Sequence, residues 1–129
     1  MKVFFDTNVY VAEALLGDAA ERMLEATSKA SWRIFASPYV LDEIERVMVE
    51  RLGFSRRFAL FTRHRARRRA LLVGPATSRH RVPTDPNDSP ILQAALTAGA
   101  DYLVTNDADF LGLSPYEGLR ILSGRIRSV

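Results

Sequence analysis

The chain opens with the stretch MKVFFDTNVY, residues 1–10, in which an apolar run ends abruptly at three polar side chains. The run is short and rich in β-favouring residues, which predicts a buried strand over residues 2–5. Asp6, Thr7 and Asn8 follow at once. A carboxylate that ends a buried strand needs polar partners or a cation, because an isolated buried charge is costly. This junction therefore predicts the first strand of a sheet and, beside it, a polar site.

Apolar and polar stretches continue to alternate along the chain. Further strands are predicted at 32–36, 71–73, 102–104 and 119–122, and helices at 10–16, 19–29, 38–52, 55–70 and from residue 89 or 90 to 98. Strands separated by helices pair in parallel, and short continuous apolar strands suit a sheet covered on both faces. We therefore expect an α/β fold, a Rossmann-like three-layer α/β/α sandwich around a central parallel sheet. No repeat or linker interrupts the sequence, so residues 1–129 are expected to form a single domain.

The composition excludes several classes of protein. The chain has no cysteine, which rules out disulfides and thiolate metal sites and agrees with a reducing compartment. No apolar run approaches the roughly 20 residues that a membrane span needs, and the first residues lack the pattern of an export signal. No nucleophile elbow and no glycine-rich phosphate loop is present. We therefore expect a cytoplasmic protein with no membrane partner.

Arginine dominates the basic residues. Sixteen of the 18 Lys and Arg residues are arginine, and seven of them lie in the segment SRRFALFTRHRARRR, residues 55–69. Such a run is usually a solvated helix face with surface ion pairs. It is also the kind of surface that attracts phosphate. Both interpretations stay open for the seven side chains: Arg56, Arg57, Arg63, Arg65, Arg67, Arg68 and Arg69.

Acidic residues recur where a predicted strand ends or a predicted helix begins. These residues are Asp6, Asp85, Asp88, Asp107 and Asp109. In parallel sheets the carboxyl ends of the strands share one edge, where ligands bind. Carboxylates gathered there repel one another and call for a cation, and oxygen ligands select Mg²⁺ or Mn²⁺. Simpler roles are available to Asp88 as a helix cap and to Asp85 as a turn residue.

Three segments of the chain together resemble the PIN domain family. They are DTN at 6–8, SPYVLDEIERVM at 37–48 and DPNDSPILQAALTAGADYLVTNDADFL at 85–111. More narrowly, the layout is similar to toxin components of prokaryotic toxin–antitoxin pairs, which include the VapC-like ribonucleases. The resemblance spans most of the chain, and the long last segment makes it specific.

The resemblance assigns roles to particular residues. Helical periodicity alone does not choose between Glu43 and Glu45, which flank the apolar stripe of their helix on opposite sides; the family pattern selects Glu43. Asp109 is a further acid expected within reach of the metal. The catalytic, metal-binding acids implied by the resemblance are Asp6, Glu43, Asp88 and Asp107, with Asn8 and Thr105 as polar supports.

The function implied by the resemblance is a Mg²⁺- or Mn²⁺-dependent endoribonuclease that acts as the toxin of a toxin–antitoxin pair. Its partners would be an RNA substrate, an antitoxin protein and, in a homodimer, a second copy of the chain. Acids that hold a divalent ion activate water and stabilise the leaving oxygen, so no side-chain nucleophile is needed. The arginine-rich segment would then help to attract a polyanion to an acidic centre.

Two alternatives belong to other classes. One is a catalytically weak or inactive PIN-fold module that binds RNA or protein. The other is a phosphatase that forms an aspartyl-phosphate on Asp6, but the haloacid-dehalogenase pattern has a second aspartate two positions later, where this chain has Asn8.

Overall fold

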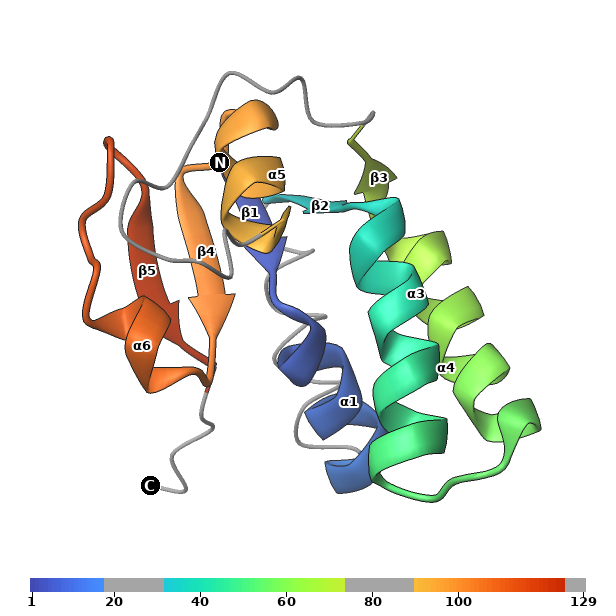
Figure 1. The fold of residues 1–129 in the computed structure, drawn as a ribbon. Helices are drawn as coiled ribbons and strands as arrows, with labels where there is room; N and C mark the ends of the chain where they lie inside the picture. Colours follow the sequence, from blue (N-terminus) through green and yellow to red (C-terminus); the bar gives the residue numbers. More distant parts are fainter. Residues whose placement is uncertain (18–31, 74–89, 125–129) are drawn as a thin grey trace.

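Five strands form one fully parallel sheet in the computed structural model, which describes residues 1–17, 32–73 and 90–124 (Figure 1). The strand order is β3-β2-β1-β4-β5. All five predicted strands and their parallel arrangement are confirmed. The strands are β1 (Lys2–Phe5), β2 (Arg33–Ala36), β3 (Leu71–Leu72), β4 (Tyr102–Thr105) and β5 (Arg120–Ser123).

Helices connect and cover the strands. They are α1 (Thr7–Leu16), α3 (Pro38–Arg46), the π-helical turn η1 (Val47–Arg51), α4 (Arg56–Arg69), α5 (Pro90–Thr97) and α6 (Ala108–Leu111). Helix α1 begins at Thr7, three residues earlier than predicted, because Asp6 caps it. The short helix α6 was not predicted. The predicted helix over 19–29 and the loop over 74–87 lie outside the described residues.

Consecutive residues of the central strands are buried. Val3, Phe4 and Phe5 in β1 are at most 2% exposed, and Leu103 and Val104 in β4 are also buried. Successive side chains of a strand point to opposite faces, so their shared burial requires packing on both faces of the sheet. The architecture is therefore the predicted α/β/α sandwich. Figure 1 shows α5 crossing in front of β1, and α3 lying beside α4.

Helix α3 starts and faces the core as its sequence predicts. Ser37 caps it by accepting a hydrogen bond from the Val40 N–H (3.3 Å), and Pro38 occupies the first turn. Val40, Leu41, Ile44 and Met48 are buried. The helix continues through η1 to Arg51, and these two elements form one wall of the site described below.

None of the helices in the described part of the chain combines the length and apolar character needed to cross a membrane.

Candidate active site

Asp6 lies where β1 passes into α1, and hydrogen bonds fix both of its carboxylate oxygens. The Thr7 N–H donates to Oδ1 (2.7 Å). The Thr105 hydroxyl donates to Oδ2 (2.7 Å), and the Asn8 amide donates to the same oxygen (3.2 Å). Parallel pairing of β1 with β4 brings Thr105 to this position. The two predicted supporting residues, Asn8 and Thr105, thus both contact Asp6 directly.

Glu43 reaches the same place from α3. Its Oε2 accepts a hydrogen bond from the Thr7 hydroxyl (3.4 Å), and its Oε1 pairs with Arg46 (2.7 Å). Glu45 points elsewhere, because it pairs with Arg63 of α4 (2.8 Å). The structure therefore places Glu43, and not Glu45, beside Asp6.

Asp107 and Asp109 approach from the end of β4. The Asp107 N–H donates to the Thr105 hydroxyl oxygen (3.0 Å), the same group that donates to Asp6. Asp107 caps α6 by accepting a hydrogen bond from the Asp109 N–H (2.8 Å). One threonine hydroxyl thus links the carboxylate at the end of β1 to the acidic turn at the end of β4.

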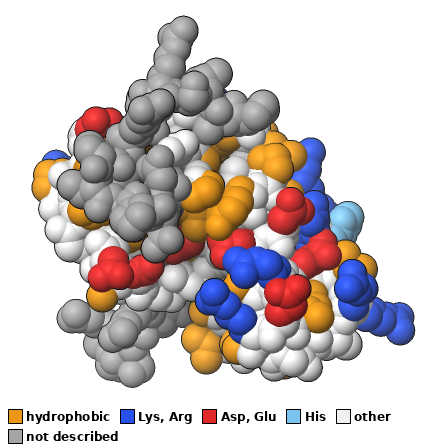
Figure 2. Space-filling model, in the orientation of Figure 1, with side chains coloured by type: hydrophobic (Ala, Val, Ile, Leu, Met, Phe, Trp, Pro, Cys, Tyr) orange, Lys and Arg blue, Asp and Glu red, His pale blue; other side chains and the backbone are white. Residues whose placement is uncertain are grey.

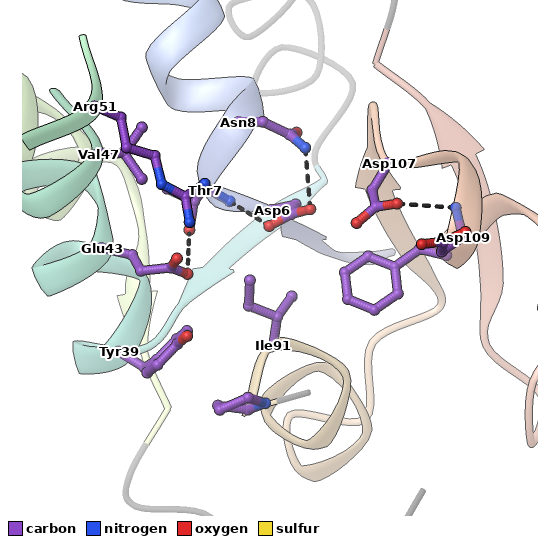
Figure 3. Close-up of a pocket in the computed structure, with 12 residues that line it drawn as sticks. Asp6, Thr7, Asn8, Tyr39, Glu43, Val47, Arg51, Ile91, Asp107 and Asp109 are labelled. Carbon is purple, nitrogen blue, oxygen red and sulfur yellow. Dashed lines mark hydrogen bonds between the residues drawn. The ribbon is translucent and has the colours of Figure 1, made fainter. Parts of the chain in front are cut away.

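These acids line a single cavity of about 360 Å³ (Figure 3). Asp6 lies between Glu43 on one side and Asp107 with Asp109 on the other. The remaining predicted acid, Asp88, lies outside the described residues, although Pro90, two positions later, lines the cavity. The complete lining comprises Asp6, Thr7, Asn8, Tyr39, Glu43, Val47, Arg51, Pro90, Ile91, Asp107, Asp109 and Phe110.

Burial and neighbouring carboxylates raise the pKa of two groups in the cavity, Asp6 and Tyr39. Burial raises the pKa of the Asp6 carboxyl, and the charges of Glu43 and Asp107 raise it further, while the hydrogen bonds from Thr105 and Thr7 act in the opposite direction. The pKa of Tyr39 is raised by partial burial and by the nearby charge of Glu43. A cation in this cavity would relieve the repulsion.

The chemistry of the cavity fits a hard divalent ion, since its donors are carboxylate, hydroxyl and amide oxygens. The positions of these side chains match the ligand shell of such an ion only in part. Within residues 1–17, 32–73 and 90–124, no three acidic or histidine side chains are already arranged to hold a metal ion. A full ligand set therefore requires a small movement of these side chains, another donor such as the predicted Asp88, or water.

The arginine-rich helix α4 lies apart from the cavity and serves a structural role for part of its length. Arg63 pairs with Asp42 (2.6 Å) and Glu45 of α3, and Arg69 pairs with the buried Glu13 of α1 (2.6 Å). Arg65 lies 3.5 Å from the same glutamate. Acidic and basic side chains are interspersed over this side of the molecule (Figure 2). RNA binding stays a prediction for this helix, whose four exposed arginines are Arg56, Arg57, Arg67 and Arg68.

The sequence reasoning missed several residues of the cavity. Tyr39, Val47 and Arg51 line it together with Glu43, at intervals of four residues along α3 and η1. Ile91 and Phe110 supply apolar lining from α5 and α6. Tyr39 and Val47 lie one turn either side of Glu43 and could have been found once Glu43 was chosen, whereas Arg51 faces the cavity only because η1 is a π-helical turn.

A parallel sheet with acids gathered at the carboxyl ends of β1 and β4 defines an α/β protein with a polar site at its strand ends. The PIN domain family model matches residues 2–109, so the chain belongs to the PIN domain family.

One solved structure shares the fold over nearly the whole length of both chains. It is the crystal structure of VapBC2 from Rickettsia felis bound to a DNA fragment from their promoter, with a TM-score of 0.71 and 20% sequence identity. The similarity covers 95% of this chain and 98% of that one. No curated protein matches the sequence.

Proposed function

We propose that this PIN-domain protein is a divalent-metal-dependent endoribonuclease, the toxin of a toxin–antitoxin pair. One observation carries the proposal: Asp6, Glu43 and Asp107, which come from three separate elements, face one cavity in a chain of this family. Burying Asp6 beside two other carboxylates is unfavourable in the absence of a cation. Such an arrangement is expected where a divalent ion and a phosphodiester are to be bound.

The chain's own residues would hold and orient the ion. Asp6, Glu43 and Asp107 are the proposed ligands, with Asp109 and the predicted Asp88 as further donors. Mg²⁺ or Mn²⁺, when bound, supplies a Lewis acid that makes water more acidic and offsets negative charge on the phosphate. Hydrogen bonds already fix the proposed ligands: Thr105 and Asn8 hold Asp6, Thr7 and Arg46 hold Glu43, and the Asp109 N–H holds Asp107. Because these hydrogen bonds already orient the ligand side chains, the side chains lose little conformational freedom when the ion binds.

The partners follow from the same proposal. RNA is the substrate, and the similarity to VapBC2 supports an antitoxin protein as a partner. We also propose a homodimer in the cytoplasm; light scattering of the purified protein would reveal the dimer mass, and a monomer mass would contradict it.

The test is cleavage of mixed RNA by the purified protein in Mg²⁺, in Mn²⁺ and in chelator, with any co-purified inhibitor removed first. We expect cleavage only with a divalent ion. Glu43→Gln and Asp107→Asn remove charge, and each keeps one carbonyl oxygen as an acceptor, at Glu43 for one of its two donors, Thr7 or Arg46, and at Asp107 for the Asp109 N–H. Each substitution should lower the cleavage rate by about 100-fold or more.

The matched control is Asp101→Asn. Asp101 accepts a hydrogen bond from the Lys2 N–H (2.9 Å) at the amino ends of β1 and β4, whereas the cavity lies at their carboxyl ends, so its loss of charge should not affect cleavage. Full activity in Glu43→Gln and Asp107→Asn would reject the site. RNA binding without cleavage would favour the binding module, and a phosphate trapped covalently on Asp6 would favour the phosphatase.

A further inference from the structure

Four residues at four-residue intervals form one wall of the acidic cavity: Tyr39, Glu43, Val47 and Arg51. In an α-helix, four residues turn the chain about 40° further than one full rotation. Three such steps would turn Arg51 roughly 120° away from Tyr39. The wall therefore cannot be explained by a regular α-helix.

The π-helical turn η1 keeps Arg51 on the cavity side. Within this turn the Leu52 N–H donates to the Val47 carbonyl (3.0 Å), a bond across five residues instead of four. A π turn holds more residues than an α turn, so its four-residue step falls short of a full rotation and offsets the earlier drift. Such π turns are frequent at functional sites. Figure 3 shows the Arg51 side chain extending along this wall toward Thr7 and Glu43.

Arg51 carries a charge that the cavity acids do not neutralise directly. Glu43, the acid on the same helix face, is paired with Arg46 at 2.7 Å. Among the described residues, Arg51 takes part in no ion pair and no side-chain hydrogen bond. A guanidinium group binds phosphate oxygens well, because its planar N–H groups match their geometry. The group is thus available to a phosphate that enters the cavity.

Tyr39 lies on the same wall and is 40% exposed, although it is a large aromatic residue. It lines the cavity beside Glu43, and Val47 and Ile91 add apolar surface. Aromatic rings in such positions stack on unpaired bases. The volume of about 360 Å³ suits a unit of roughly one nucleotide.

We propose that Tyr39 and Arg51 bind one nucleotide of single-stranded RNA beside the acids, Tyr39 by stacking on the base and Arg51 by contacting a phosphate. The inference rests on the proposed function, since it places the substrate in the same cavity. It also gives the protein a preference for unpaired RNA, because a base inside a duplex cannot reach Tyr39.

The test measures binding of a fluorescent single-stranded oligoribonucleotide by anisotropy in Mg²⁺, at several salt concentrations, in an Asp107→Asn background that should not cleave it. Tyr39→Ala should weaken binding about tenfold at every salt concentration, whereas Tyr39→Phe should retain it. Arg51→Gln should weaken binding and lower the slope of log affinity against log salt by about 0.7, the loss of one phosphate contact, whereas Arg51→Lys should keep the slope.

The control is Arg120→Gln, which removes an exposed arginine at the amino end of β5, whereas the cavity lies at the carboxyl ends of the strands. It should change neither affinity nor slope. If the Tyr39 and Arg51 variants behave as expected while the wild type cleaves no RNA, the nucleotide site stands and the nuclease proposal fails. If the wild type cleaves RNA but Tyr39→Ala and Arg51→Gln keep wild-type affinity, slope and KM, the nucleotide site is overturned. Variants that lose affinity for a protein partner and not for RNA would overturn it too, as would undetectable RNA binding by the background protein.

Discussion

Asp6 caps helix α1 and lies among other acidic residues, and these two features shift the pKa of its carboxyl in opposite directions. Its hydrogen bonds with Thr7 and Thr105 favour the ionised form, but burial and the charges of Glu43 and Asp107 disfavour it, and the net effect raises its pKa. A carboxyl whose pKa is raised in the folded state stabilises the fold while it is protonated. Without a bound cation, ionised Asp6 is therefore a local weakness of the structure.

This weakness predicts a pH dependence of the metal-free protein. The folded state holds the Asp6 proton more tightly than the unfolded state, whose pKa is near 3.8. The stabilising contribution is fully present below that pH and is lost as pH rises through the higher folded pKa. Urea unfolding in chelator, from pH 3.5 to 7, should thus show wild type losing stability relative to Asp6→Asn as pH increases. A difference between the two proteins that does not vary with pH would contradict the raised pKa.

Gly124 supports the site through close approach. A Cβ added there would lie 3.0 Å from Val9 Cγ2 and 3.2 Å from the Asn106 side-chain oxygen. The Asn106 N–H donates to Asn8, which in turn contacts Asp6. Gly124→Ala should therefore lower the free energy of unfolding by about 1–2 kcal/mol through overpacking, and it should reduce RNA cleavage as well.

Gly112→Ala is the matched control for Gly124→Ala in thermal and urea unfolding. Its added Cβ would lie 3.6 Å from the nearest atoms, an ordinary contact distance. This variant should keep wild-type stability and cleavage. If Gly124→Ala is as stable and as active as Gly112→Ala, the side chains around Gly124 can shift to accept the added methyl group, and the predicted loss of stability is wrong.

A salt bridge between Glu13 and Arg69 joins helices α1 and α4, and the glutamate is the more buried of the two residues. The Glu13 side chain is 6% exposed, and Arg69 contacts both of its carboxylate oxygens at 2.6 Å. Among the residues that the structure describes, removing the arginine would leave the buried charge with the more distant Arg65 as its one ion-pair partner. Arg69→Met should therefore lower the free energy of unfolding by about 2–3 kcal/mol.

Two further variants separate charge burial from simple loss of contact. Adding Glu13→Gln to Arg69→Met removes the stranded charge and should recover part of the stability. Asp42→Asn breaks a pair with Arg63 in which the aspartate is 70% exposed, and it should cost less than about 1 kcal/mol. Urea unfolding of the set measures both effects, and equal costs for Arg69→Met and Asp42→Asn would contradict the assigned role of Glu13.

At the scale of the whole molecule, the sheet was predictable and the wall of the site was not. The strands are short apolar runs that end at polar residues, a local signal, and parallel topology then brings Asp6 next to Thr105. Which of Glu43 and Glu45 faces the cavity depends on how α3 packs against α4, because Arg63 of α4 forms an ion pair with Glu45. A local pattern cannot decide that choice.

Arg51 lines the cavity because of the π-helical hydrogen bond from the Leu52 N–H to the Val47 carbonyl. The apolar periodicity of α3 does not reveal this bond. The arginine-rich run shows the same limit. Its composition allowed ion pairs or phosphate binding, and the positions of Glu13 and Asp42 on neighbouring helices decided the partners of Arg69 and Arg63. The role of Asp88 as a ligand stays a prediction, since it lies outside the described residues.

The whole fold should respond to the ion that its acids are proposed to hold. A ligand that binds only the folded state stabilises it, by about 1.4 kcal/mol at ten times its dissociation constant, which for a domain of this size corresponds to a Tm increase of about 4–6 °C. Mn²⁺ or Mg²⁺ should produce this shift in wild type and in Asp101→Asn, but not in a variant that combines Glu43→Gln with Asp107→Asn. Differential scanning calorimetry measures the shift without any RNA. An equal shift in the double variant would place the ion elsewhere on the molecule, and the acids of the cavity would then need another explanation.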